Sequence, residues 1–178
     1  MPTIHLTSFI QAPIERVFDL SRSIDLHKKS MTDSAEEAVA GTTNGLIQLG
    51  ETVTWKGKHL GKTRFHKSRI SALQAPIHFI DEMMEGDFKS FEHAHHFMKI
   101  ENGTIMIDLV NYEVPYGVIG RLVDRFYLFR YLVKMMEARN LFIKQTAESE
   151  RWRQFLFAAH EQSSQSLYIP VSRPVTSL

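Results

Sequence analysis

The sequence contains no cysteine, so neither a disulfide framework nor a thiolate metal site can form. It also lacks an excess of charge of one sign, because 21 basic residues are balanced by 20 acidic ones. A nucleic-acid-binding surface normally shows as a strong basic excess, and we therefore expect no nucleic-acid partner. The absence of cysteine is compatible with a reducing compartment, and the cytoplasm is the expected location.

Long hydrophobic runs are missing as well. No stretch approaches the ~18–20 uninterrupted apolar residues of a membrane-spanning helix. Residues 1–6 (MPTIHL) have neither the basic start nor the apolar run of a signal peptide. The sequence thus predicts no membrane span.

The composition and the length of the chain suit one folded domain. Hydrophobic residues make up 43% and aromatic residues 11% of the 178 residues, enough to bury a sizeable core. A chain of this length most simply forms one domain, which we place at residues 1–160. Residues 161–178 are rich in serine, contain Pro170 and Pro174, and are predicted to form a flexible tail.

The hydrophobic pattern predicts one strand, two short helices, five strands and one long helix, in that order. The first strand covers residues 3–11, one helix follows Pro13, and the next lies at 24–31. Residues 32–44 are expected to be mainly a loop. Turn signals, among them Gly57 and Asn102-Gly103, separate the later strands. These strands are expected near 46–56, 58–71, 76–84, 88–100 and 104–114.

The final helix, expected from Pro115 to about Phe157, carries a wide apolar surface. One stripe holds Ile119, Leu122, Phe126, Phe129, Val133 and Met136, and Leu128, Leu132 and Met135 widen it. A helix this apolar must be covered. We therefore predict an α+β fold in which about six antiparallel strands curve around the C-terminal helix and leave a ligand cavity between them.

The Asn102-Gly103 turn suggests the pairing of the last two strands. If Glu101 faces Thr104, then Phe97 faces Asp108, His95 faces Val110 and His93 faces Tyr112. The opposite face then sets Glu92 across from Glu113. Two like charges at that spacing repel unless water screens them, so the histidine face is predicted to be the inner one. Met98, Ile100, Ile105 and Ile107 argue against this, because they make part of the other face apolar.

An earlier strand supplies further inward candidates. Glu51, Val53 and Trp55 alternate on one face, and His59 joins them if no bulge intervenes at Gly57. The side on which Asp81 lies is left open by the turn that follows it.

The sequence resembles the SRPBCC/START-like superfamily, and within it a group of uncharacterised, mostly bacterial ligand-binding domains. The similar segments are the strand-Ala-Pro-helix start, GLIQLGETVTWKGKHLG at 45–61, PIHFIDEMMEGDFKSFEHAHHF at 76–97, GTIMIDLVNYEVPYGVIGRLVD at 103–124 and the Arg139-Asn140 helix. The resemblance covers about residues 3–146 and implies a helix-grip fold with an internal cavity. Relatives include lipid carriers, plant-hormone receptors, and polyketide cyclases and dehydratases, so the resemblance settles the fold better than the chemistry.

The pair His93 and His95 is the sharpest candidate, because residues i and i+2 of a strand point to one side. The two imidazoles can contact a ligand, belong to a structural network, act as acid and base, or hold a metal with a third ligand from Glu51, His59 or Asp108. We expect neither a metal nor a cofactor. The predicted ligand-binding residues are Glu51, Trp55, His59, Asp81, Phe91, His93, His95, Phe97, Asp108, Tyr112, Phe126 and Phe129, and the catalytic candidates are His93, His95, Asp108 and Glu51.

Three functions remain open at this stage. The first is a binder of a small, partly apolar molecule whose polar end is held by histidine and acid groups. The second is a cofactor-independent cyclase, dehydratase or hydrolase that uses the same pocket for acid–base catalysis. The third is an interaction or stress-response module whose wide helix pairs with another subunit, through Leu128, Leu132 or Met135. The partner is thus expected to be a small molecule, and the protein a monomer or homodimer.

Overall fold

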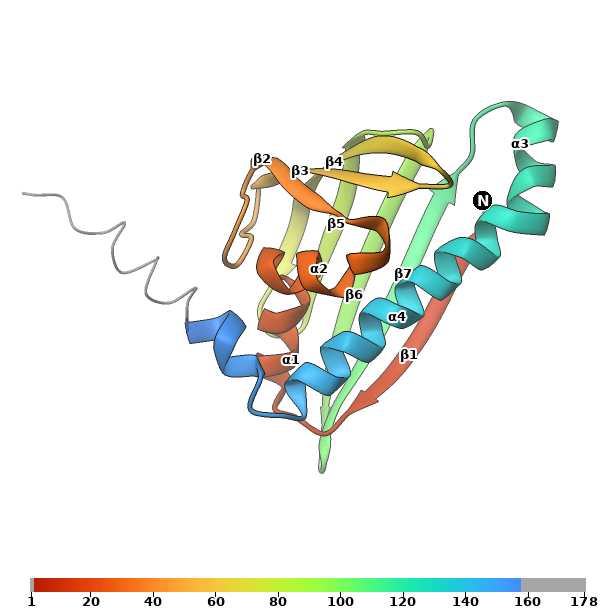
Figure 1. Ribbon diagram of the computed structural model, residues 1–178. Helices are drawn as coiled ribbons and strands as arrows, with labels where there is room; N and C mark the ends of the chain where they lie inside the picture. Colours follow the sequence, from red (N-terminus) through yellow and green to blue (C-terminus); the bar gives the residue numbers. More distant parts are fainter. Residues whose placement is uncertain (1, 158–178) are drawn as a thin grey trace, which may run out of the picture.

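Seven antiparallel strands form one curved sheet that wraps around a long helix (Figure 1). The structure, a computed structural model, describes residues 2–157, and the tail predicted at 161–178 lies outside this range. The strand order is β1-β7-β6-β5-β4-β3-β2, so the first strand lies beside the last one. The strands are β1 (Thr3–Ile10), β2 (Glu37–Gly41), β3 (Thr52–His59), β4 (Lys62–Gln74), β5 (His78–Glu85), β6 (Ser90–Ile100) and β7 (Gly103–Glu113).

The helices cover one face of this sheet. Two short helices follow β1, and the long helix α4 crosses the concave side. They are α1 (Ile14–Ser21), α2 (Ile24–Ser30), the single 3-10 turn Thr32–Ser34, α3 (Gly117–Val123), a π-helical turn (Asp124–Leu128) and α4 (Phe129–Ala147). The predicted α+β helix-grip architecture is therefore confirmed. Among residues 2–157, no helix is long and apolar enough to cross a membrane.

The sheet has one strand more than predicted, because β2 lies where a loop was expected. β2 is an edge strand that pairs only with β3, through a bulge between Ala38 and Ala40. Four of its five residues are exposed, so it carries no alternation of buried and exposed positions. The sequence pattern consequently offered no strand signal there.

Gly57 is not the predicted turn but an interior residue of β3, where it pairs with Arg64. The chain turns instead at Leu60-Gly61, both at positive φ. A Cβ atom at Gly57 would lie 2.7 Å from Cγ of Glu36 and 2.9 Å from Nε2 of His59. The glycine therefore serves close packing within the strand.

The hairpin of β6 and β7 is shifted by two residues from the predicted pairing. Ile100 pairs with Gly103, and His95 lies directly opposite Asp108. A shift of two preserves which side chains share a face, so the predicted inward direction of His93, His95 and Asp108 is confirmed, and all three are buried. Glu92, predicted opposite Glu113, faces Asn111 instead.

The buried side of α4 changes character along its length. Leu132 and Met136 pack on an apolar cluster from β1 and β7, and Ile143 and Ala147 pack on a second one built around α1 and α2. Between these two clusters the buried positions are polar, namely Arg139 and Asn140. A polar layer is thus set between two apolar ones.

The predicted single helix from Pro115 to Phe157 is interrupted. Helix α4 ends at Ala147, and residues 152–157 form a separate short helix. The π-helical turn Asp124–Leu128 changes the phase between α3 and α4, because each residue of such a turn advances less than in an α-helix. The predicted alignment of Ile119, Leu122 and Phe126 with Met136 is therefore wrong, and Ile119 and Phe126 are about 70% exposed (71% and 70%).

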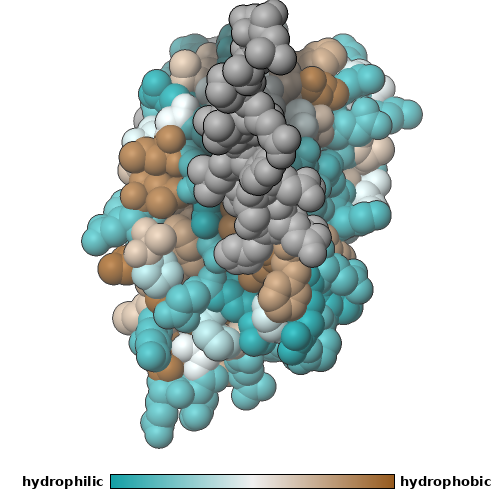
Figure 2. Space-filling model, turned by 90° about the vertical axis from the view of Figure 1, so that its left-hand side faces the viewer, coloured by the Kyte–Doolittle hydropathy of each residue, from teal (hydrophilic) through white to brown (hydrophobic). Residues whose placement is uncertain are grey.

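Exposed large hydrophobic residues gather on α3 and the π-helical turn, which project from the body of the molecule in Figure 1. They are Val118, Ile119, Leu122, Val123, Phe126 and Tyr127, together with Tyr116, which directly precedes α3. On the side shown in Figure 2, by contrast, hydrophobic residues lie in small groups between hydrophilic ones. Scattered apolar side chains are ordinary on a protein surface, whereas a run of seven within twelve positions is not.

Candidate functional site

A cavity of about 460 Å³ lies between the inner face of the sheet and the helices α2, α3 and α4. This volume falls in the range of small-molecule sites, roughly 300–1,000 Å³. Its lining includes the exposed residues Leu60, Phe65, Tyr116 and Ile119, so the cavity reaches the surface between the β3–β4 turn and α3. The lining is mainly apolar and is interrupted by two polar clusters.

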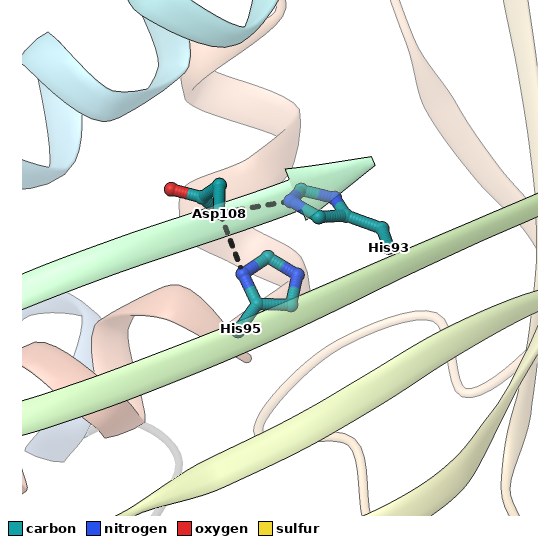
Figure 3. Close-up of side chains that lie close together, drawn as sticks. All are labelled: His93, His95 and Asp108. Atoms are coloured by element: carbon teal, nitrogen blue, oxygen red, sulfur yellow. Dashed lines mark hydrogen bonds and ion pairs between the residues drawn. The ribbon is translucent and has the colours of Figure 1, made fainter. Parts of the chain in front are cut away.

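The inner cluster is centred on Asp108 of β7 (Figure 3). Nε2 of His93 hydrogen-bonds Oδ1 of Asp108 at 2.8 Å. Nδ1 of His95 also lies 2.8 Å from this oxygen, but the contact is too poorly aligned to be a hydrogen bond. The strand pairing explains this convergence, because His95 is opposite Asp108 and His93 is two residues further along the same face.

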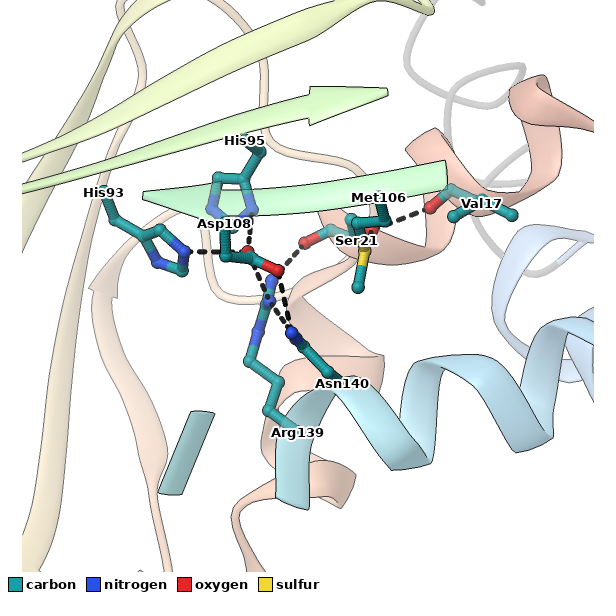
Figure 4. A network of polar contacts seen from close by, with 8 residues as sticks. All are labelled: Val17, Ser21, His93, His95, Met106, Asp108, Arg139 and Asn140. Carbon is teal, nitrogen blue, oxygen red and sulfur yellow. Dashed lines mark hydrogen bonds and ion pairs between the residues drawn. The ribbon is translucent and has the colours of Figure 1, made fainter. Parts of the chain in front are cut away.

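Helix α4 closes this cluster from the other side (Figure 4). Nδ2 of Asn140 donates to Oδ2 of Asp108 at 2.8 Å. Nη1 of Arg139 lies 3.7 Å from Oδ1 of Asp108, and Nη2 donates to the backbone oxygen of Ser21 at 2.9 Å. The network therefore joins β6, β7, α1 and α4 around one carboxylate.

Burial and charge set the protonation of the inner cluster. Burial alone would raise the pKa of Asp108, but the contacts with His93 and His95 outweigh it and hold that pKa well below its usual range. Burial and the neighbouring His93 lower the pKa of His95 well below its ordinary value. Burial also lowers the pKa of Arg139, and Asp108 opposes this shift. At neutral pH the cluster thus holds an ionised Asp108, a neutral His95 and a charged Arg139.

His93, His95 and Asp108 are also the one group within residues 2–157 whose ligand atoms could meet at a metal ion, all within 4.8 Å of one another. Two imidazoles and a carboxylate suit zinc. However, Asn140 already occupies the second carboxylate oxygen, and the Arg139 guanidinium lies beside the first. A positive charge at that distance opposes a second cation, so the donor set fits a metal poorly.

The outer cluster is centred on Glu36, which the sequence analysis did not single out. Its carboxylate contacts Nε2 of His27 at 2.8 Å and Nε2 of His59 at 3.2 Å, and Ser34 donates to it at 3.1 Å. Burial would raise the pKa of Glu36, but the two histidines outweigh it and lower that pKa strongly. Nδ1 of His59 lies 2.7 Å from the hydroxyl of Tyr131, so this cluster joins α2, β3 and α4.

Six of the twelve predicted ligand-binding residues line the cavity. They are Trp55, His59, Asp81, Phe91, His93 and His95. Phe97, Asp108 and Tyr112 are buried but are not part of the lining. The hydroxyl of Tyr112 instead donates to Asp124 at 2.6 Å, and burial together with this carboxylate raises the pKa of Tyr112.

The remaining three predicted residues lie away from the cavity. Glu51 precedes the first residue of β3, is exposed, and accepts hydrogen bonds from Thr42 and the backbone of Gln48. Phe126 points to the surface because of the π-helical turn. Phe129 is half-buried and packs against the apolar cluster of β1 and β7.

Several lining residues were missed by the sequence analysis, namely Glu36, Arg64, His66, Arg139 and Tyr131. His66 is opposite Trp55 on β4, and the pairing of β3 with β4 would have identified it. Burial lowers the pKa of His66, and the nearby Asp81 opposes this. Leu128, Leu132 and Met135, considered as a subunit contact, also line the cavity.

No family model and no curated protein sequence matches the chain. Solved structures do match it. TTHA0849 from Thermus thermophilus is 19% identical with a TM-score of 0.65, and the match covers 82% of this chain and 97% of that one. CV1439 from Chromobacterium violaceum is 12% identical with a TM-score of 0.63, covering 84% and 99%.

A plant protein is matched over nearly its whole length as well. Major latex-like protein 151 from Panax ginseng is 15% identical with a TM-score of 0.61, and the match covers 82% of this chain and 97% of that one. Identities this low speak for the shared architecture and not for a shared ligand. The chain therefore shares the helix-grip fold of these structures, as its sequence predicted.

Proposed function

We propose that the protein binds a small amphiphilic molecule in the cavity between the curved sheet and α4. The observation that carries this proposal is a cavity of about 460 Å³ lined mainly by apolar side chains, with a minority of polar and charged groups among them. Such a lining suits an apolar body and a polar end. The helix-grip neighbours support the proposal by fold alone.

The polar groups favour a retained cavity over a collapsed core. Trp55 stacks on His27 with ring centroids 4.1 Å apart, and His27 is held by Glu36. On the opposite side Arg139 is fixed by Ser21 and Asp108. These networks fix the walls independently of any ligand, which lowers the entropic cost of binding.

A dye titration tests the proposal. N-phenyl-1-naphthylamine is neutral and fluoresces strongly only in apolar surroundings, so we expect saturable uptake at one dye per chain. Met135 lines the cavity, and Met135→Trp should narrow it and weaken uptake. The matched control is Ala138→Trp on the exposed side of the same helix, which should bind the dye normally. No uptake by the unmodified protein, or equal uptake by Met135→Trp, would contradict the proposal.

Acid–base catalysis in the same cavity is a second candidate, and His93 favours it. This imidazole lines the cavity and is oriented by the ionised Asp108, the arrangement that general bases share. The molecule released from protein purified from its own cells can be incubated with fresh protein and with His93→Gln. A new mass formed by the unmodified protein alone supports catalysis, and an unchanged molecule in both samples leaves binding as the function.

A further inference from the structure

The charged groups that line the cavity are almost all neutralised by neighbours. Arg22 pairs with Asp19 at 2.8 Å, Arg64 pairs with Asp87, and Arg139 is held by Asp108 and Ser21. Among the lining carboxylates, Glu36 has its two histidines and Asp87 has Arg64. The remaining lining carboxylate is Asp81.

Asp81 has no hydrogen bond or ion pair to any residue in the described part of the chain, and its Oδ1 is buried. It lies on β5 between Ile70 of β4 and His93 of β6, with Phe79 two residues before it on the same face. Asp81 as a whole is half-buried and lines the cavity, so a molecule in the cavity can reach its carboxylate. A buried acceptor oxygen gains free energy when a donor reaches it, and the described part of the chain supplies none to Oδ1.

The nearest titratable groups do not complete it. The negative charge of Asp81 raises the pKa of His66, but burial lowers this pKa by more and keeps the imidazole neutral at pH 7. Asp81 also raises the pKa of Arg139 through its charge, but the direct contacts of Arg139 are with Asp108 and Ser21. No ion pair within 4.0 Å joins Arg139 to Asp81. His93 directs Nε2 to Asp108. Asp81 is thus the uncompensated negative charge of the lining.

We propose that Asp81 accepts the polar end of the bound molecule, and that this end is a hydrogen-bond donor, either a protonated amine or a hydroxyl group. This inference rests on the proposed binding function and names the class of ligand. A carboxylate or phosphate end is disfavoured twice. It would face the free negative charge of Asp81, and it would find the three lining arginines already engaged by Asp19, Asp87 and Asp108.

Three molecules with the same ten-carbon chain test the inference by calorimetric titration at pH 7. Decylamine is a cation, 1-decanol is a neutral donor, and decanoate is an anion. We expect decylamine to bind at least about tenfold more tightly than decanoate, with 1-decanol between them, because a hydrogen bond to a charged acceptor is worth at least about that factor. In Asp81→Asn, which keeps the shape and removes the charge, the preference for the amine should fall to near unity.

The matched control is Glu82→Gln, the same loss of charge at the next residue. Glu82 is paired with Arg69 and is not part of the cavity lining, so this variant should keep the preference for the amine. Thermal unfolding of both variants checks that they are folded. Decanoate as the tightest ligand, or an amine preference that survives in Asp81→Asn, would overturn the inference while the proposed binding function stands. Failure of all three molecules to bind the unmodified protein would overturn both.

Discussion

Asp108→Asn is the substitution whose consequence follows most directly from the inner cluster. The side chain of Asp108 is 1% exposed and accepts hydrogen bonds from His93 and Asn140. Asparagine has the same shape, but it carries no charge and offers one acceptor oxygen in place of two. The charge of Arg139, itself 4% exposed, is then left without its nearest carboxylate.

The size of the effect can be estimated from these contacts. Removing one partner of a buried ion pair costs about 3–5 kcal/mol of unfolding free energy. Here the Arg139 nitrogen lies 3.7 Å from Asp108 and keeps its hydrogen bond to Ser21, which places the loss at the lower end, about 3 kcal/mol. For a protein of this size such a loss lowers Tm by about 6–12 °C.

Urea unfolding at pH 7 measures this loss as a lower midpoint with an unchanged slope m. Asp87→Asn is the control, because the pair of Asp87 with Arg64 is exposed, with a predicted loss of about 0–1 kcal/mol. In the double variant Asp108→Asn/Arg139→Met, no buried charge is left unpaired, and part of the loss should be recovered. A loss in Asp108→Asn no larger than that of Asp87→Asn would refute the assignment of a charged inner cluster.

Three further predictions concern other parts of the molecule. Burial holds the pKa of His95 below its ordinary value, so below about pH 6.5 the unfolded chain takes up a proton that the folded one does not. Stability should therefore fall on acidification, and in His95→Gln this slope should be smaller by up to about 1.4 kcal/mol per pH unit; an unchanged slope contradicts the assignment. Gly57→Ala should cost about 1–3 kcal/mol in urea unfolding, because the added methyl group lies 2.7 Å from Cγ of Glu36. Phe126→Ser should cost less than about 0.5 kcal/mol, whereas Met136→Ala should cost about 2–5 kcal/mol; equal losses would place Phe126 in the core.

The side of the sheet to which a strand residue points could be predicted from sequence, because side chains alternate and only odd or even spacing matters. The predicted pairing of β6 with β7 was wrong by two residues, yet His93, His95 and Asp108 still came to one side. The side of Asp81 was left open, because the turn after β5 does not fix a register from sequence alone. The structure pairs Asp81 with His93 of β6, which places both side chains on the inner face.

Helical phase was less predictable than strand parity. The apolar spacing from Ile119 to Met136 fits one continuous helix, but the π-helical turn between α3 and α4 shifts the phase and exposes Phe126. Glu36 could not be found at all by local pattern. It reaches His59 because Gly57 lacks a side chain, and that proximity arises only once β2 has paired with β3.

The place of β1 has a consequence for the order in which the chain can assemble during its synthesis. Strands β2 to β7 each pair with a neighbour in sequence, so they can form one after another as the chain emerges from the ribosome. β1 is made first, but Thr3 pairs with Asn111, 108 residues later. The inward-facing Ile4 and Ile10 of β1 must therefore wait, uncovered, until β7 has been synthesised, and the edge of the sheet and its covering helix α4 are completed together at the end.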